Sequence, residues 1–316
     1  MSAYRAWGRR ANRHPGTSTA PSASNAASIS LVIPTLNEAA NLPHVLTRIP
    51  SMVDEVLLVD GHSIDDTISV ARAIRPDVRV VLQDGRGKGD ALACGFAAAS
   101  GDIIVMLDAD GSTDPAEIPR FVDALLDGSD FAKGSRFVTG GDSSDITPLR
   151  SAGNRVLSRT VNLLFRTSYT DLCYGYNAFW RHCLPHMRIT CTGFEVETLI
   201  NVRVARAGLR VTEVASVEYE RIHGESKLNV VRDGARVLRA ILSERTRPRR
   251  IARNDEWHPT FRELPPPELG DEPDQPAPAW DGAADSRDGG VRQRSTMFAG
   301  PDISTLPATG ASGSAG

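Results

Sequence analysis

Short apolar segments alternate with helical patterns through the first half of the chain, and this alternation limits the possible folds more than any other feature. Apolar runs of this length are typical of strands buried on both faces. The expected strands are 29–34, 55–60, 78–83 and 103–107, and the expected helices are 39–49, 66–75, 90–99 and 115–126. Strands and helices that alternate in this way build a parallel sheet with helices on both faces.

The pattern changes after residue 130. Strands are expected at 131–137, 176–180 and 211–219, and helices at 150–165, 195–207 and 228–243. We find no internal repeat in the sequence. The predicted fold class is therefore α/β, with a mostly parallel, Rossmann-like sheet flanked by helices.

Composition divides the chain into one folded region and two tails. Residues 1–27 are rich in Ser, Ala, Thr, Pro and Arg without periodicity, so we expect a disordered basic tail. Residues 248–316 contain Pro265-Pro266-Pro267, acidic stretches and a Gly-rich end, and are expected to form a second disordered tail. Residues 28–247 are left as a single domain of ordinary size.

The charge balance gives no indication of a nucleic-acid partner, because the net charge is only −3 over 316 residues. Arginines do cluster on both sides of the folded region, at Arg5–Arg13 and Arg245–Arg253. Such segments bind anionic membrane surfaces at about 1 kcal/mol per charge. The alternative is a solvated basic tail.

We find neither a signal peptide nor a run of the roughly 20 apolar residues that a membrane span needs. The sequence therefore predicts a cytoplasmic protein, with any contact to the inner face of the cell membrane being peripheral. The four cysteines form no Cys-X-X-Cys pair, which is consistent with reduced thiols. His182, Cys183, His186 and Cys191 match no standard zinc spacing.

Asp108-Ala109-Asp110 follows the expected strand 103–107 directly. Both carboxylates therefore leave the carboxyl end of a strand, the edge at which α/β sheets bind ligands. Hard anionic oxygens suit Mg²⁺ or Mn²⁺ held together with substrate phosphates. Acidic pairs also cap loops, so the neighbouring motifs decide between the two interpretations.

Polar residues follow the first two strands at the same edge. Pro34-Thr35-Leu36-Asn37-Glu38 ends the first strand, and Asp60 ends the second. An aspartate in this position can accept a hydrogen bond from a base or a ribose, although a turn or N-cap role is the alternative for Asp60.

Arg86-Gly87-Lys88-Gly89 precedes a helix. Exposed backbone N–H groups at a helix N-terminus favour anions, and two cationic side chains suit a diphosphate. A solvated basic turn is the alternative.

Taken in order, these motifs resemble the family 2 glycosyltransferases of GT-A fold, in particular the polyprenyl- and dolichyl-phosphate sugar transferases. The resemblance runs from Leu31 to about Leu242. Its most specific pieces are residues 32–38, the loop 59–67, Asp108-Ala109-Asp110, Gly134-Ser135-Arg136, Thr170-Asp171-Leu172, Gly175-Tyr176-Asn177-Ala178 and the segment 221–228. Gly61 and Ser112 depart from the pattern of many relatives, and these positions bear on the base and the metal that are used.

The resemblance implies roles position by position. It implies a nucleotide-sugar site at Pro34, Thr35, Asn37, Glu38, Asp60, Arg86, Lys88, Asp108, Ala109 and Asp110, with Mg²⁺ or Mn²⁺ on Asp108 and Asp110. It implies an acceptor-phosphate site at Arg136, Arg150, Asn154, Arg221, Ser226 and Lys227.

The activity implied is inverting, metal-dependent transfer of a hexose, from GDP-mannose or a UDP-hexose, to a polyprenyl phosphate. A phosphate monoester has its second pKa at about 6, so such an acceptor is already a dianion at neutral pH and needs no strong base. A hydroxyl acceptor would need one, and Asp171 and Glu195 are the candidates. The predicted catalytic set is Asp110, Arg136, Asp171 and Glu195.

Two alternatives remain. The first is a family 2 transferase with a soluble or polysaccharide acceptor, and the second is a non-catalytic scaffold of the same fold.

Two helices have basic amphipathic patterns. In the last one, Leu228, Val231, Ala235, Leu238 and Leu242 share a face, and in the helix 155–165 the residues Leu157, Val161 and Leu164 do so. Arginines lie beside both faces, which is typical of helices that lie on an anionic membrane. The alternative is that these faces pack on the sheet.

Overall fold

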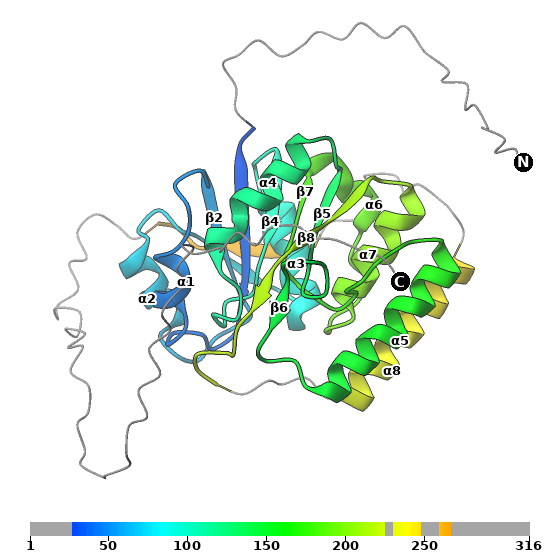
Figure 1. Ribbon diagram of the computed structural model, residues 1–316. Helices are drawn as coiled ribbons and strands as arrows, with labels where there is room; N and C mark the ends of the chain where they lie inside the picture. The colour runs from blue at the N-terminus through cyan, green and yellow to red at the C-terminus, as the bar shows by residue number, and fades with distance from the viewer. Residues whose placement is uncertain (1–26, 225–229, 248–258, 267–316) are drawn as a thin grey trace, which may run out of the picture. The chain divides into compact units, whose positions relative to one another are not determined.

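An eight-stranded, mixed sheet with helices on both faces forms the centre of the computed structural model (Figure 1), which describes residues 27–224, 230–247 and 259–266. The strand order is β10-β3-β2-β1-β4-β7-β5-β8. Its members are β1 (Ile29–Thr35), β2 (Glu55–Asp60), β3 (Arg79–Gln83), β4 (Ile103–Met106), β5 (Phe131–Ser135), β7 (Asn177–Trp180), β8 (Val211–Ala215) and β10 (Phe261–Glu263). β1 to β4 are mutually parallel, as the alternating pattern predicted.

Alternate residues of β1 explain the layers. Leu31 and Ile33 point to a core shared with α1 (Leu42–Leu46), α2 (Thr67–Ile74) and α4 (Ile118–Leu126). Val32, between them, points to a second core shared with α3 (Gly87–Ala98), α6 (Leu184–Met187) and α7 (Val196–Ala207). Because successive side chains of a strand point to opposite faces, a strand buried on both sides needs the continuous apolar run seen in the sequence.

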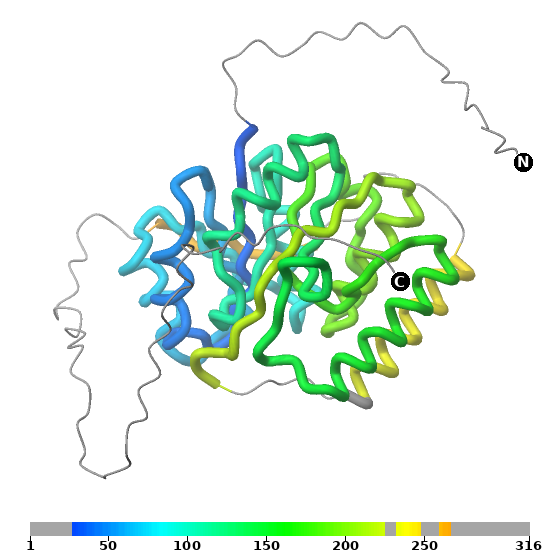
Figure 2. Tube along the Cα trace, in the orientation of Figure 1, coloured from blue at the N-terminus to red at the C-terminus, as the bar shows by residue number. Residues whose placement is uncertain are grey.

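A third layer lies outside α7. It consists of α5 (Pro148–Phe165) and α8 (Val230–Thr246), which pack on α7 through Val161, Val202, Val237 and Ile241. Figure 2 shows the two helices side by side at one side of the molecule. Among the described helices, none is long and apolar enough to cross a bilayer.

Three expectations differ from the structure. The expected strand 211–219 is divided, since its last part forms β9 (Val217–Glu218), which pairs with β6 (Asp142–Ser143) in a separate two-stranded sheet. The expected helix 39–49 is shortened to α1. The expected tail 248–316 contains β10, which pairs antiparallel with β3. β10 was missed because it has only three residues, two of them charged, between nearby prolines.

The structure corrects the amphipathic assignment for α5 but not the one for α8. In α5 the predicted membrane face is wrong, because Val161 is fully buried in the core and Leu157 and Leu164 pack beside it. In α8 the residues Leu238 and Leu242 are exposed, as a membrane face requires, while Val237 and Ile241 are buried. Leu228 lies outside the described residues, and so does the side chain of Val231.

Candidate functional site

Lys88 joins two carboxylates at the carboxyl edge of the sheet. Its Nζ lies 2.6 Å from Asp108 Oδ1 and 2.6 Å from Glu197 Oε1. Burial opposes the charge of Lys88, but the two carboxylates outweigh it and raise the pKa of the ammonium. Burial also raises the pKa of Glu197, and Lys88 offsets only part of that rise. The cation predicted for a diphosphate is thus already held beside Asp108.

Asp110 is held from two directions. Its Oδ1 accepts hydrogen bonds from the Ser112 backbone N–H and hydroxyl, at 3.0 and 2.6 Å. Its Oδ2 lies 2.7 Å from Arg221 Nη2. Ala109 is buried in the core between the two aspartates. The polypeptide around residue 221 therefore lies over the second aspartate of the motif.

A buried ion-pair network lies behind these residues. The Arg136 guanidinium makes two side-chain hydrogen bonds to Asp171, of 2.7 and 3.0 Å, and two to Glu218, of 3.0 and 2.9 Å. Asn154 Nδ2 adds a bond of 3.1 Å to Asp171, and the Tyr174 ring lies 4.9 Å from the Arg136 Cζ. Burial opposes ionisation of Asp171, but Arg136 outweighs it and lowers the pKa of that carboxyl.

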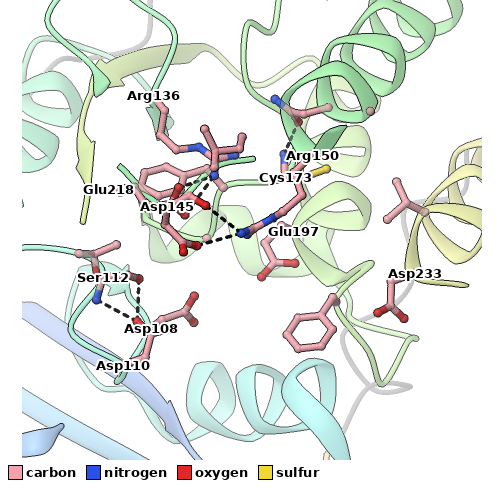
Figure 3. A pocket seen from close by; sticks show the side chains of 18 of the residues that line it. Asp108, Asp110, Ser112, Arg136, Asp145, Arg150, Cys173, Glu197, Glu218 and Asp233 are labelled. Carbon is pink, nitrogen blue, oxygen red and sulfur yellow. Dashed lines mark hydrogen bonds and ion pairs between the residues drawn. The ribbon is translucent and has the colours of Figure 1, made fainter. Parts of the chain in front are cut away.

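These groups line one side of a cavity (Figure 3). Its charged and polar walls include Lys88, Asp108, Asp110, Arg136, Arg150, Asn154, Glu197 and Arg221. Its apolar walls include Ile146, Leu157, Phe194 and Val237. Arg150 pairs with Asp145 at 2.8 Å, and both side chains are partly exposed. The cavity thus combines four cations with an apolar wall supplied partly by α5 and α8.

Asp171 and Glu195, the two predicted bases, are not among the residues that line this cavity. Asp171 is fully buried and holds Arg136, whereas Glu195 precedes the first residue of α7. Sequence reasoning missed Glu197, two residues later, and also Glu218 and Asp145. Glu195 and Glu197 both stand at the start of α7, so the sequence does not distinguish them. Only the packing of α7 brings Glu197, and not Glu195, to Lys88 and the cavity.

The predicted nucleotide residues form a second group beside the first two strands. Thr35 and Asp60 are paired in register at the ends of β1 and β2, and both are buried. Asp60 accepts hydrogen bonds from the Ser63 N–H and hydroxyl, at 2.9 and 2.6 Å, which confirms the turn role weighed for it. Asn37 links the same loops by accepting from the Ile64 N–H at 2.8 Å.

None of the residues Pro34, Thr35, Asn37, Glu38, Asp60 and Arg86 lines the cavity described above, so a nucleotide contact at these residues stays a prediction.

Arg86 is exposed at the start of α3. Gly89, by contrast, donates its N–H to the Thr192 carbonyl at 3.2 Å, so this N–H does not face an anion. A Cβ on Gly87 or Gly89 would lie only 2.1 Å from a backbone oxygen, of Thr192 or Cys191 respectively. Ser226 and Lys227 lie outside the described residues.

Asp108 and Asp110 supply only some of the ligands that Mg²⁺ or Mn²⁺ needs. Within the described segments, no cluster of three or more His, Cys, Asp or Glu side chains could hold a metal. Two carboxylates are nevertheless the usual protein share of a site whose other ligands are substrate phosphates and water. The residues therefore fit an ion that binds together with a diphosphate.

Comparison with known proteins agrees with this arrangement. The family model described as glycosyl transferase family 2 matches residues 30–187, half of the chain. The chain belongs to this family. It is therefore a glycosyltransferase, and the resemblance to polyprenyl-phosphate sugar transferases is confirmed by its relatives.

Three curated relatives of this family 2 enzyme illustrate the likeness. The undecaprenyl-phosphate mannosyltransferase of Micrococcus luteus is 32% identical, over 63% of this chain and 86% of the relative. Glycosyltransferase AglJ of Haloferax volcanii is 31% identical, over 65% and 68% respectively. The dolichol-phosphate mannosyltransferase of Pyrococcus furiosus is 31% identical over 63% of this chain, which spans only 59% of that relative's length.

A solved structure supports the GT-A fold. Glucosyl-3-phosphoglycerate synthase of Mycobacterium tuberculosis superimposes with a TM-score of 0.55 and 26% identity, over 70% of this chain and 81% of that one. That enzyme was crystallised with Mn²⁺, uridine diphosphate and glucosyl-3-phosphoglycerate. Divalent metal use is thus seen among the structural neighbours of this chain.

Proposed function

We propose that this enzyme transfers a hexose from a nucleotide sugar to a polyprenyl phosphate at the inner face of the cell membrane, with inversion at the anomeric carbon. The observation that carries the proposal is the mixed lining of the cavity. Arg150 and Arg221 face the same space as Leu157, Phe194 and Val237. A phosphate on a hydrocarbon chain matches both parts of that lining, whereas a free sugar acceptor would leave the apolar part in contact with polar groups.

The donor end of the site is assigned to Asp108, Asp110 and Lys88. A bound Mg²⁺ or Mn²⁺ would supply Lewis-acid stabilisation of the departing nucleotide diphosphate. Ser112 orients Asp110 through two hydrogen bonds, and Lys88 offers positive charge close to Asp108. The base and ribose of the donor, GDP or UDP, are assigned to the loops after β1 and β2.

The acceptor phosphate is assigned to Arg150, Arg221 and Lys227. The first two have partly exposed side chains, paired in the structure with Asp145 and Asp110, so they can exchange a carboxylate for a phosphate. Arg136 is only 5% exposed and bound to two carboxylates, so its part is to position the cavity wall. Because the phosphate is already anionic, Asp171 has no proton to remove.

A second candidate is a soluble, phosphorylated acceptor. Structures of the glucosyl-3-phosphoglycerate synthase neighbour contain phosphoglyceric acid, which carries its phosphate on a small polar molecule. The same cations would serve this phosphate. In that case the apolar wall would remain unused, and transfer to a hydroxyl would need a base.

Calorimetric titration with matched acceptors tests the proposal. We expect a short-chain polyprenyl phosphate to bind in the presence of Mn²⁺ and the nucleotide diphosphate, and the corresponding polyprenol to bind at least about tenfold more weakly, because it lacks the charge that two arginines recognise. Two results would contradict the assignment. One is equal affinity for the polyprenyl phosphate and the polyprenol, and the other is binding of 3-phosphoglycerate without binding of the polyprenyl phosphate.

A further inference from the structure

We propose that Asn41 is a positioning residue for the transfer reaction. Its side-chain amide anchors residues 219–224, which we call the Arg221 segment, and so fixes the place from which Arg221 meets the acceptor phosphate. The purpose of the anchor rests on the proposed function, whereas the anchor itself is argued from burial and hydrogen bonds.

Asn41 stands at the start of α1, but its side chain does not cap the helix. Asparagine is common at this position because its side-chain oxygen accepts a hydrogen bond from an N–H of the first turn. Asn41 makes no such bond, and it is only 3% exposed. A buried amide that does not serve its own helix needs hydrogen-bond partners elsewhere.

These partners are the main-chain groups of His223, 182 positions further along the chain. Asn41 Nδ2 donates to the His223 carbonyl at 3.2 Å, and Asn41 Oδ1 accepts from the His223 N–H at 3.0 Å. A side-chain amide has a donor and an acceptor, as a peptide group does, so it can hold residue 223 as a neighbouring strand would. Figure 2 shows the yellow-green Arg221 segment beside the blue part of the chain that contains α1.

The Arg221 segment crosses the loop that carries Asp110. The Tyr219 N–H donates to the Ser112 carbonyl at 2.9 Å, and the Ile222 N–H donates to the Asp110 carbonyl at a longer 3.4 Å. Between these two bonds, Arg221 Nη2 lies 2.7 Å from Asp110 Oδ2. Because the bond made by Ile222 is long, the two bonds from Asn41 provide the firmer hold on the carboxyl-terminal side of Arg221.

This hold matters because arginine has a long side chain with many rotamers. The Arg221 side chain is 29% exposed, so the position of its guanidinium depends on how well its main chain is fixed. A displacement of about 1 Å in a group that positions the substrate can cost about 10²-fold in rate. Asn41 is not among the residues that line the cavity, so it acts through the Arg221 segment rather than by touching the acceptor.

Two variants of Asn41 and one matched control test the inference. Asn41→Ala removes the amide, and Asn41→Ser keeps a hydroxyl that cannot make both bonds to His223. The control is Asn162→Ala. Asn162 holds Tyr169 by the same reciprocal pair, since it donates to the Tyr169 carbonyl at 2.9 Å and accepts from the Tyr169 N–H at 2.8 Å.

Hydrogen–deuterium exchange of the full-length protein, followed by mass spectrometry, tests the anchor without any substrate. In the wild type, the peptide that contains Ile222 and His223 should be protected. Its exchange should be about tenfold faster in both Asn41 variants, because the His223 N–H loses its acceptor. The control should exchange like the wild type in this peptide. An unprotected wild-type peptide, or unchanged exchange in a folded Asn41 variant, would overturn the anchor.

Kinetics and calorimetry then separate positioning from a loss of general stability. In both Asn41 variants, kcat/KM for a short-chain polyprenyl phosphate should fall at least about tenfold. The affinity for the nucleotide diphosphate with Mn²⁺ should stay within about threefold, because the contacts of Lys88 with Asp108 and Glu197 do not involve the Arg221 segment. The control should keep the wild-type kcat/KM.

Three results would overturn the positioning role. They are an unchanged kcat/KM despite faster exchange, an equal loss of nucleotide affinity, and an equal loss of kcat/KM in the control. No transfer by the wild type to the polyprenyl phosphate would instead refute the proposed function, and the exchange measurement would still decide whether Asn41 holds the Arg221 segment.

Discussion

Asp171→Asn distinguishes a positioning aspartate from a catalytic base. In the structure Asp171 is fully buried and bound to Arg136 and Asn154. Breaking a buried ion pair by removing one partner costs about 3 kcal/mol or more. With a urea m-value of about 3 kcal/mol per molar, the unfolding midpoint should fall by about 1 M.

Asp145→Asn provides the matched control for this change. It also removes one carboxylate from an arginine, but the side chains of Asp145 and Arg150 are 36% and 24% exposed. Such a partly exposed pair contributes less than about 1 kcal/mol. Both variants are unfolded in urea and followed by circular dichroism, and the shift of the midpoint should be clearly larger for Asp171→Asn.

The pH dependence has a definite sign. Burial favours the neutral form of Asp171, but Arg136 outweighs this effect and lowers the pKa of the carboxyl below its ordinary value of 3.8. A carboxylate of this kind stabilises the fold above its unfolded-state pKa, and the contribution is lost as the pH falls through the lower folded-state pKa. The stability difference between wild type and Asp171→Asn should therefore be largest near neutral pH and shrink below about pH 4.

Catalysis provides the refuting result. At a temperature where Asp171→Asn is folded, its transfer rate should fall less than about tenfold, since loss of a general base typically costs 10²- to 10⁴-fold. A variant with wild-type stability, a loss of about 10³-fold and a missing limb in the pH–rate profile would show that Asp171 is the base. The acceptor would then be a hydroxyl.

Further predictions concern the donor end of the cavity. Asp110→Asn should weaken nucleotide binding at least about tenfold in Mn²⁺ but not without metal, as measured by calorimetry. Lys88→Met leaves Glu197 and Asp108 without their shared cation, so the free energy of unfolding should fall by about 3 kcal/mol. The melting temperature should then fall by roughly 6–12 °C. An unchanged melting temperature would contradict the ion pairs that Lys88 makes with these two carboxylates. Gly175→Ala places a Cβ 3.1 Å from Lys88 Nζ and 3.2 Å from Asp108 Oδ2, so the turnover number should fall about tenfold with the circular dichroism spectrum retained.

The parts of the fold that sequence could predict are those fixed by local pattern. The apolar runs of β1 to β4 specify buried parallel strands, because each strand must be apolar on both faces. The same reasoning placed Asp108 and Asp110 at the ligand-binding edge, and the structure has them there, facing the cavity. β10 could not be predicted, since its pairing with β3 joins residues almost two hundred positions apart and leaves little local signal.

The parts of the site that sequence could not predict depend on tertiary packing. Glu197 meets Lys88 only because α7 packs on the sheet beside α3, and Glu218 reaches Arg136 only because β9 leaves the main sheet. The exposed face of α5 was misassigned for a related reason. Leu157 and Leu163 are equally apolar in sequence, and only the packing of α5 against its neighbours leaves Leu157 partly buried and Leu163 exposed.

Transfer of labelled sugar is the measurement that tests the proposed activity most directly. Purified enzyme is incubated with Mn²⁺, a panel of labelled UDP- and GDP-sugars, and a short polyprenyl phosphate, and the label in the lipid phase is counted. We predict transfer from one donor, dependent on the lipid and lost in Asp110→Ala. Donor binding or slow hydrolysis that is indifferent to the lipid, with label passing instead to a soluble acceptor, would contradict a lipid-phosphate transferase.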